Sequence, residues 1–258
     1  MTRIIEIGLD NPKMKKELLE AGFIEREDGS FTKPGVETLK PQPIKKIDEI
    51  YVVDTETTGL DGFPEDVIVE IAVCKVDTEK KTVDVIYDSI VGHGVKSWDH
   101  LRKHAWIFGN SDLALVDVSK ATPQKDVVKK VREILKDKYV TSFNTDYDFT
   151  RFLCCDPWDL YEVVKDICNC IMLSATPVCG IEGYYGEYKW PRLEEAYAIL
   201  CKDNPAKVKD QPHRALSDTL MASHVLLSLI DRDAYSLTQN VSSKTDNLTT
   251  CQKSEGNT

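Results

Sequence analysis

Residues 51–60 read YVVDTETTGL, and this stretch decides the fold. Together with Ile50, its first residues form an almost continuous apolar run, which is typical of a strand buried on both faces in a sheet covered by helices. Such a strand should not carry acids, yet this one ends in Asp54 and Glu56. Because side chains alternate along a strand, both carboxylates project from the same face into one small volume.

The two carboxylates need a partner if they lie at the edge of an apolar core. Side by side they repel each other and resist the loss of water unless a cation joins them. Oxygen ligands select a hard cation, so Mg²⁺ or Mn²⁺ is expected. Thr57, Thr58 and Gly59 then turn the chain away and leave backbone amides beside the carboxylates. An isolated Asp-x-Glu would more simply be a pair of solvated acids, so a metal site needs support from the rest of the chain.

The composition of the 258 residues is that of an ordinary globular protein, with 41% hydrophobic and 29% charged residues. This length can bury one sizeable core and a small appendage. A net charge of -10 disfavours a protein that coats nucleic acid through a broad basic face. It does not exclude an enzyme that holds a few nucleotides through metal ions.

The sequence also indicates a compartment. No apolar run approaches the roughly 18 residues of a membrane span, and the first residues lack the apolar core of a signal peptide. We therefore expect a cytoplasmic protein with no membrane partner. The eight cysteines include no Cys-x-x-Cys pair, so free thiols that pack as small hydrophobes are the better interpretation.

Three segments differ in their patterns. Residues 1–46 are expected to form a small N-terminal appendage and linker, with a helix over residues 11–22 and a hairpin around Asp28-Gly29. Residues 47–232 should form the main domain. Residues 233–258 are rich in Ser, Thr and Asn without periodicity, which indicates a polar, disordered tail.

The main domain reads as a mixed α/β sheet flanked by helices. Strand patterns at 67–76 and 82–87 are joined by a polar turn, so the first three strands should be antiparallel neighbours. Helical patterns cover 98–107 and 123–137, and a strand at 139–143 leads directly into another helix. This order of strands and helices is typical of an α/β fold.

A second acidic site follows the strand at 139–143. Asp148 lies in the first turn of the next helix, where an acid is favourable against the helix dipole for structural reasons alone. However, ligands of open α/β sheets bind beyond the carboxyl ends of strands, where Asp54 and Glu56 also lie. Asp148 can therefore face the same crevice.

A third site opens the last strong helical pattern. Asp218 lies on a helix that is apolar nearly all round, so its carboxylate must be paired, and a metal shared with Asp54 would pair it. His213 comes five residues earlier, beside Pro212, where it is free to swing over the site. A histidine suits proton abstraction at neutral pH, although taken alone it would more often be a surface or capping residue.

Together, these three sites resemble the DEDDh 3′→5′ exonuclease family, which includes the proofreading subunit of bacterial replicative polymerase. The matching patterns cover about residues 48–230 and are Asp54-x-Glu56 followed by Thr-Thr-Gly-Leu, Asn144-x-x-Tyr147-Asp148, and His213-x-x-x-x-Asp218. Two features depart from the family. Trp106 to Gly109 lack the His-Gly pair common in the proofreading branch, and residues 1–46 have no counterpart.

The resemblance implies a ribonuclease H-like, mixed five-stranded sheet and hydrolysis of the terminal phosphodiester at the 3′ end of single-stranded DNA or RNA. Nucleoside 5′-monophosphates would be released with the help of two Mg²⁺ or Mn²⁺ ions. The implied metal ligands are Asp54, Glu56, Asp148 and Asp218, with His213 as general base. The implied substrate contacts are Thr57, Thr58, Leu60, Asn144 and Tyr147, with Leu60 wedged against the last base. A polymerase or another protein is a candidate partner.

Alternatives remain open at this point. A non-catalytic nucleic-acid-binding or polymerase-docking module with the same fold would usually have lost a carboxylate, whereas all four acids and the histidine are present here. A phosphodiesterase of very short oligonucleotides would use the same residues. The aromatic loop at 180–190 could stack the bases of a single strand, but its rings are at least as well explained by packing on the body.

Overall fold

The computed structural model divides the chain into two compact units, Met1–Ile44 and Lys45–Thr258. The residues it describes are 15–16, 19–21, 24–25, 31–32, 46–184, 186–202 and 213–237. In the first unit, strands β1 (Ile24–Glu25) and β2 (Phe31–Thr32) pair antiparallel. They are the two strands of the predicted hairpin, whose turn lies outside the described residues. The other predictions for residues 1–14 and 33–45 also lie outside them.

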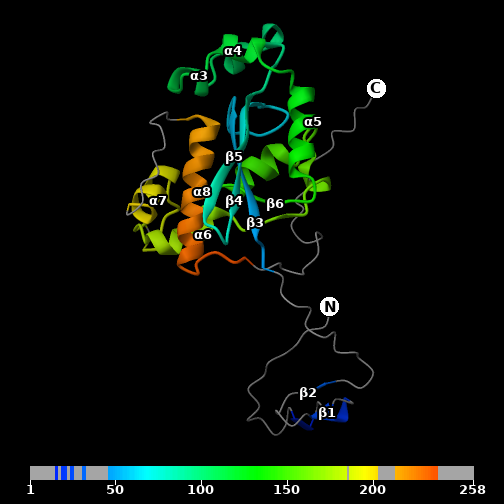
Figure 1. The fold of residues 1–258 in the computed structure, drawn as a ribbon, viewed down its shortest axis with the longest axis vertical. Helices are drawn as coiled ribbons and strands as arrows, with labels where there is room; N and C mark the ends of the chain where they lie inside the picture. The colour runs from blue at the N-terminus through cyan, green and yellow to red at the C-terminus, as the bar shows by residue number, and fades with distance from the viewer. Residues whose placement is uncertain are drawn as a thin grey trace. The chain divides into compact units, whose positions relative to one another are not determined.

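A mixed five-stranded sheet forms the centre of the second unit, with strand order β5-β4-β3-β6-β7 (Figure 1). The antiparallel strands are β3 (Glu49–Thr57), β4 (Ile68–Asp77) and β5 (Thr82–Ile90), as predicted. Strands β6 (Tyr139–Thr141) and β7 (Asp166–Ile167) extend the sheet parallel to β3. The mixed sheet flanked by helices is confirmed. The two residues of β7 are too few to show a strand pattern in the sequence.

One face of the sheet is covered by helices from the second half of the chain. Ile50 and Val52 of β3 are fully buried in a cluster with these helices, because alternate residues of the strand face them. The helices are α6 (Ile171–Cys179), α7 (Leu193–Leu200) and α8 (Ala215–Asp231). Helix α8 packs directly on β3 and β4, and α7 packs on α8.

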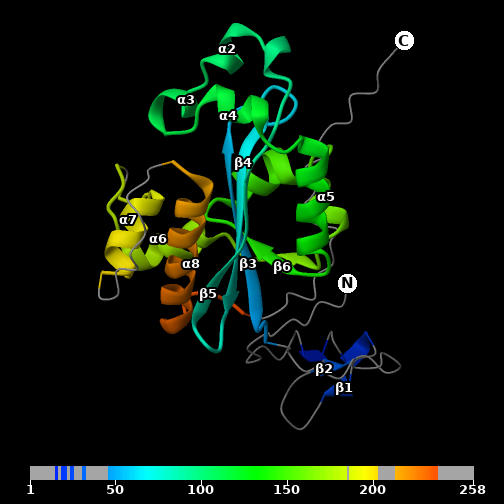
Figure 2. The same cartoon turned by 45° about the horizontal axis from the view of Figure 1, so that its top comes forward.

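The opposite face receives the other alternate residues of β3. Tyr51 and Val53 pack into a second cluster with the predicted amphipathic helix, which the structure places at α5 (Gln124–Leu135). Figure 2 shows α8 on one side of the sheet and α5 on the other. This cluster also takes in the π-helix η2 (Asp146–Leu153) and the 3-10 helix η3 (Leu160–Glu162). Strand β3 is therefore covered on both faces, as its apolar run predicted.

Short helices lie beyond the end of the sheet at which β3 finishes (Figure 2). The predicted helix over 98–107 is instead two single turns, because Trp98, Ile107 and Leu113 enter a small core of their own at spacings that one helix cannot satisfy. Asp99 accepts a hydrogen bond from the Arg102 amide and so caps the first of these turns. The elements are η1 (Val95–Ser97), α2 (His100–Lys103), α3 (Ile107–Asn110) and α4 (Leu115–Lys120).

The chain stays packed on the body beyond the boundary predicted for the tail. Tyr235 is 5% exposed and its hydroxyl donates to the Asn169 carbonyl at 2.7 Å. The amide of Ile47 donates to the carbonyl of Leu237 at 2.9 Å. Apolar contact with α8 and these bonds order residues 233–237, which contradicts the predicted disorder there. The rest of that segment lies outside the described residues.

Two expectations drawn from composition can be compared with the structure. The seven cysteines within the described ranges are all free thiols, as expected. No helix among the described residues combines the length and apolarity that crossing a bilayer would need.

Candidate metal centre

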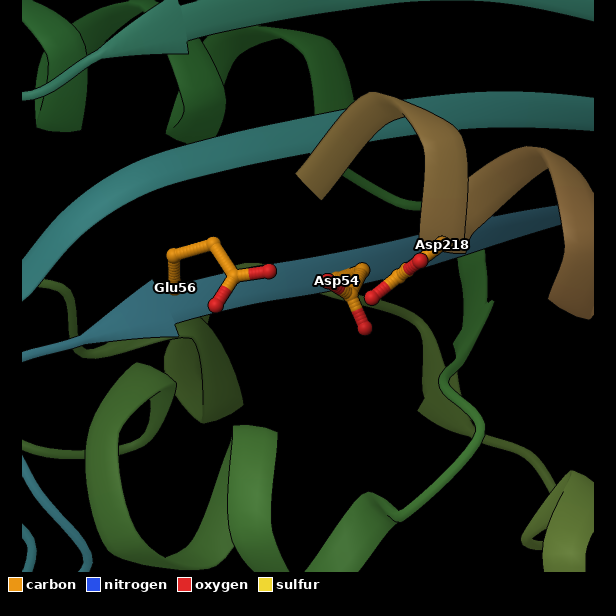
Figure 3. A group of neighbouring side chains, drawn as sticks. All are labelled: Asp54, Glu56 and Asp218. Atoms are coloured by element: carbon orange, nitrogen blue, oxygen red, sulfur yellow. The ribbon is translucent and has the colours of Figure 1, made fainter. Parts of the chain in front are cut away.

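Three carboxylates meet where β3 ends against the start of α8. Asp54 and Glu56 belong to β3 and Asp218 to the first turn of α8, and each offers one oxygen within 4.8 Å of the other two. Figure 3 shows Asp218 reaching from α8 toward Asp54 on the strand. Both strand acids continue the face formed by Ile50 and Val52, which is the face that α8 covers. The alternation along β3 thus brings these three predicted residues together.

Burial and repulsion hold these acids in an unfavourable state without a cation. Burial is the largest cause of the raised pKa of all three. The pKa of Glu56 is raised to about 8, with Asp218 the next cause. The pKa of Asp218 is raised to about 7, and that of Asp54 lies well above its usual range. A divalent cation would replace the protons, and three converging carboxylates are the donors that hard cations take.

Asp148 contacts β3 at Thr55. Thr55 lies between the two strand acids and its side chain points the other way, so its hydroxyl donates to Asp148 Oδ1 at 2.7 Å. Asp148 is 3% exposed, and burial raises its pKa to about 6. After burial, Asp148 is the largest cause of the raised pKa of Asp54. It is thus an electrostatic neighbour of the three carboxylates, and its role as fourth metal ligand stays a prediction.

His213 lies just before α8, against an aromatic side chain. Its imidazole meets the indole of Trp106 edge to face, with ring centroids 4.6 Å apart and an interplanar angle of 78°. Its backbone is left-handed, with φ of 58°. Of the described residues, only Asp54, Glu56 and Asp218 form the carboxylate group, and the imidazole is not part of it. Its role as general base stays a prediction.

Two predicted substrate contacts form a small hydrogen-bonded cluster. The hydroxyls of Thr57 and Tyr147 lie 2.5 Å apart, and each donates toward the carbonyl of Gly59, at 2.8 and 2.9 Å. The backbone amide of Tyr147 donates a hydrogen bond to Asn144 Oδ1 at 3.4 Å. This cluster ties η2 to the chain that leaves β3, so Thr57, Tyr147 and Asn144 are held together.

The loop after β3 folds around Asp66. Thr58 Oγ1 donates to Asp66 Oδ1 at 2.8 Å, and the Asp61 amide donates to Asp66 Oδ2 at 3.0 Å. The Thr58 amide donates to the Val67 carbonyl at 3.0 Å. This amide is therefore engaged within the fold, and contact of Thr58 with a substrate stays a prediction. The side chain of Leu60 is 72% exposed at the tip of the loop.

In the aromatic loop at 180–190, the described rings of Tyr184, Tyr188 and Trp190 are exposed. Tyr184 is 94% exposed and Trp190 is 65% exposed. The amide of Gly183 donates to the Glu187 carbonyl at 2.7 Å, so the loop has a folded base. The alternative in which these two rings pack into the body does not hold, and base stacking by the loop stays a prediction.

Sequence reasoning missed a buried ion pair beside the centre. Glu70 on β4 lies opposite Glu56 on β3 and is 1% exposed. Its carboxylate accepts hydrogen bonds from the guanidinium of Arg214. The signal was available, since a glutamate in the otherwise apolar run of residues 67–74 must find a cationic partner if the strand is buried.

Comparisons with known proteins identify the fold. No family model matches this chain, and no curated protein sequence matches it. A full-length 3′-exonuclease matches 80% of this chain and 66% of its own, with TM-score 0.53 and 15% identity. A 3′-exonuclease described in the 3′-end-specific recognition of a histone mRNA stem-loop matches with TM-score 0.52 and 16% identity, over 74% of this chain and 85% of its own.

E. coli Exonuclease I in complex with a dA16 oligonucleotide matches with TM-score 0.50 and 14% identity, over 70% of this chain. The match covers 40% of the Exonuclease I chain and just under two thirds of the full-length 3′-exonuclease, so the likeness concerns a domain. The mixed five-stranded sheet flanked by helices is thus the ribonuclease H-like fold of these 3′-exonucleases.

Proposed function

We propose that this protein is a metal-dependent 3′→5′ exonuclease of the DEDDh type. It would hydrolyse the terminal phosphodiester of single-stranded nucleic acid and release nucleoside 5′-monophosphates. The observation that carries the proposal is the convergence of Asp54, Glu56 and Asp218 within 4.8 Å, in a fold shared with 3′-exonucleases. Bringing three carboxylates from distant parts of the sequence together costs free energy, because they repel one another. A bound cation would offset this repulsion.

The carboxylates would hold Mg²⁺ or Mn²⁺. When bound, such ions polarise the scissile phosphate and lower the pKa of the attacking water. Asp54 is central, since Glu56 lies beside it on the strand and Asp218 faces it from α8. Asp148 would complete the ligand set, with the Thr55 hydroxyl fixing the orientation of its carboxylate. Ions held by these residues would stabilise the negative charge that develops on the reacting phosphate.

His213 would accept the proton of the attacking water. Its imidazole rests against Trp106, so it must turn toward the carboxylates when substrate enters. Catalytic groups are often loosely placed before substrate binds. The exposed Leu60 would wedge against the terminal base, and the Thr57 and Tyr147 hydroxyls would border the terminal sugar.

Release of mononucleotides from a 5′-labelled single strand tests the proposal. Wild type should shorten the strand from its 3′ end with Mg²⁺ or Mn²⁺ and not with EDTA. His213→Ala should lower turnover by about 100-fold or more, the usual contribution of a general base, and leave metal affinity nearly unchanged. A wild-type protein that binds the strand and leaves it intact with either ion would instead be a non-catalytic module.

The proposed substrate is the 3′ end of single-stranded DNA, RNA or both, with the DNA ends that proofreading removes among them. Discrimination rests on contacts to the 2′ hydroxyl. Matched DNA and RNA oligomers of one sequence, assayed over a series of lengths, separate a DNA exonuclease, an RNA exonuclease and a phosphodiesterase of short oligonucleotides.

A further inference from the structure

The buried ion pair beside the carboxylates joins β4 to the start of α8. Arg214 Nε lies 3.0 Å from each oxygen of Glu70, and Nη2 lies 2.5 Å from Oε1. Glu70 Oε2 also accepts the amide of Ala215, the first residue of α8, at 3.1 Å. The carboxylate of Glu70 therefore binds both the side chain and the backbone at the N-terminus of this helix.

The same guanidinium reaches a third segment. Arg214 Nη1 donates to Asp112 Oδ1 at 2.6 Å, in the connection between α3 and α4. Trp106, at the N-terminus of α3, contacts the neighbouring His213. Residues 106–112 thus touch both members of the His213-Arg214 pair, and they do so through two independent contacts.

An arginine is the side chain that this geometry requires. Its planar fork can bond two oxygens of one carboxylate and still present a third nitrogen to another acid, whereas a lysine is a single point charge. Burying Glu70 with Arg214 costs desolvation that their attraction need not repay, so stability alone does not explain the pair. The location of the pair is more informative, because Arg214 directly follows His213, the proposed general base.

The backbone of His213 needs outside support. A left-handed conformation is unfavourable for a residue with a side chain, by about 1 kcal/mol or more. The Arg214 carbonyl accepts the amide of Asp218 at 3.0 Å, which fixes the first turn of α8 through backbone atoms alone. The side chain of Arg214 is therefore not needed to place Asp218, but it does anchor the residue that follows His213.

We propose that Arg214 is a positioning residue, whose guanidinium is clamped by Glu70 and Asp112 and thereby holds His213 where it can reach the carboxylates. The inference rests on the proposed function. Arg214 touches neither substrate nor water in the reaction, and it acts through the backbone and ring of His213. The partner acids lie on β4 and in the connection between α3 and α4, so the clamp joins both segments to the start of α8.

The test is a double-mutant cycle with Arg214→Lys and His213→Ala. Arg214→Lys should lower kcat by at least about tenfold, since small misplacements of a catalytic group have effects of this size. KM and calorimetric Mn²⁺ affinity should stay within about twofold. In the His213→Ala background the same substitution should cost less than about threefold, because the two changes remove one interaction. Losses that simply multiply would overturn the proposal.

Arg132→Lys is the matched control. Arg132 also bridges two elements, through hydrogen bonds from Nη1 to the carbonyls of Trp158 and Asp159, but it belongs to α5 on the other face of the sheet. It should leave kcat unchanged. If Arg214→Lys fails to fold, Asp112→Asn serves instead, because it keeps the Glu70 pair and changes an acid whose side chain is 59% exposed. It should lower kcat about threefold, and an unchanged kcat would contradict the proposal.

A readout without activity separates this inference from the nuclease proposal. The imidazole signals of His213, assigned by their loss in His213→Ala, feel the ring current of Trp106 in nuclear magnetic resonance spectra. Arg214→Lys should move them toward free-histidine positions, and Arg132→Lys should not. If wild type releases no nucleotides, the exonuclease proposal fails whatever the spectra show. Unmoved His213 signals in Arg214→Lys would sink the positioning role alone.

Discussion

The partly buried acids of the candidate centre lower the stability of the fold. The pKa of Glu56 is about 8 and that of Asp218 about 7, whereas in an unfolded chain both lie near 4. The folded, metal-free protein therefore loses stability wherever these groups are ionised. Positions that serve a function at the expense of stability are common in active sites.

We expect Asp54→Asn to stabilise the metal-free protein by about 1–2 kcal/mol, because it removes a buried carboxyl that must either stay ionised beside other acids or take up a proton on folding. The same change should abolish nucleotide release. Urea unfolding in EDTA measures the first effect. Asp126→Asn is the control: this exposed acid in the first turn of α5 should lose a few tenths of a kcal/mol, about the value of a helix-dipole contact. A loss of stability in both variants would contradict the idea of a strained acidic cluster.

A second prediction concerns pH. Because the pKa values of Glu56 and Asp218 are raised on folding, the folded state binds more protons than the unfolded state between about pH 5 and 8, and stability must fall as pH rises there. The range from about pH 7 to 8 is cleanest, since the lowered pKa values of His93 and His224 act below it.

The measurement is urea unfolding at pH 7 and 8, with EDTA and with Mn²⁺. Without metal the free energy of unfolding should drop on the order of 1 kcal/mol. With Mn²⁺ it should rise instead, because metal uptake releases the same protons. Metal-free stability that increases with pH across this interval would rule out shared protons in the cluster.

At the scale of elements, the turn after β3 is the most tightly specified part of the site. A Cβ added at Gly59 would lie 2.5 Å from Asp66 Oδ2, and that carboxylate is itself held by Thr58 and the Asp61 amide. The acid cannot simply swing away, so a side chain at residue 59 has no space.

Gly59→Ala should therefore destabilise the protein by roughly 1–3 kcal/mol, the usual cost of overpacking. It should also lower kcat, because the Gly59 carbonyl joins Thr57 to Tyr147. Gly109→Ala is the matched control, since a Cβ there meets nothing within 4 Å and alanine favours helix α3. Thermal unfolding of both variants decides: equal melting temperatures would mean that the turn adapts at little cost.

Elements whose apolar residues recur at a regular spacing could be predicted from the sequence, and irregular elements could not. The alternation of β3 foretold both its double burial and the shared face of Asp54 and Glu56, and the stripe on α5 foretold that helix. The cap over residues 95–120 was not foreseen in detail, because its apolar residues follow no period. The Glu70–Arg214 pair spans 144 positions, and no local pattern carries such a contact.

The position of Asp148 shows the same limit within the site. Its place at the end of β6 followed from the pattern of strand and helix. That its carboxylate meets the hydroxyl of Thr55, and not the three carboxylates of the cluster, depends on how η2 packs, which only the folded chain reveals. The sequence therefore pointed to the acids, while their mutual contacts came from tertiary structure.

At the scale of the whole molecule, the net charge of -10 sets how a polyanionic substrate can bind. If the protein acts as proposed, its acidic surface cannot attract nucleic acid through a broad field, and metal ions would have to neutralise the phosphates near the site. Binding of this kind releases few counterions from the strand.

The affinity for a single-stranded oligomer should accordingly depend only weakly on salt. Between 50 and 200 mM KCl at fixed Mg²⁺, KM should change by less than about threefold, whereas six to ten phosphate contacts by basic side chains would change affinity by about 10³-fold or more. Steady-state assays over this range measure the slope. A steep slope would indicate a basic docking face. The candidate residues are the lysines 125, 129 and 136, which line one surface pocket together with Arg132.

The contact between Trp106 and His213 gives the protein an optical reporter of its own. Indole emission responds to a side chain that packs against the ring, so the brightness of Trp106 should change when the imidazole of His213 leaves it. Because the indole is 58% exposed, iodide can distinguish its signal from those of the buried tryptophans at 98 and 158, and Trp190→Phe removes the other exposed indole. Stopped-flow fluorescence, with Trp106→Phe as the blank, would then time the arrival of the histidine at the substrate.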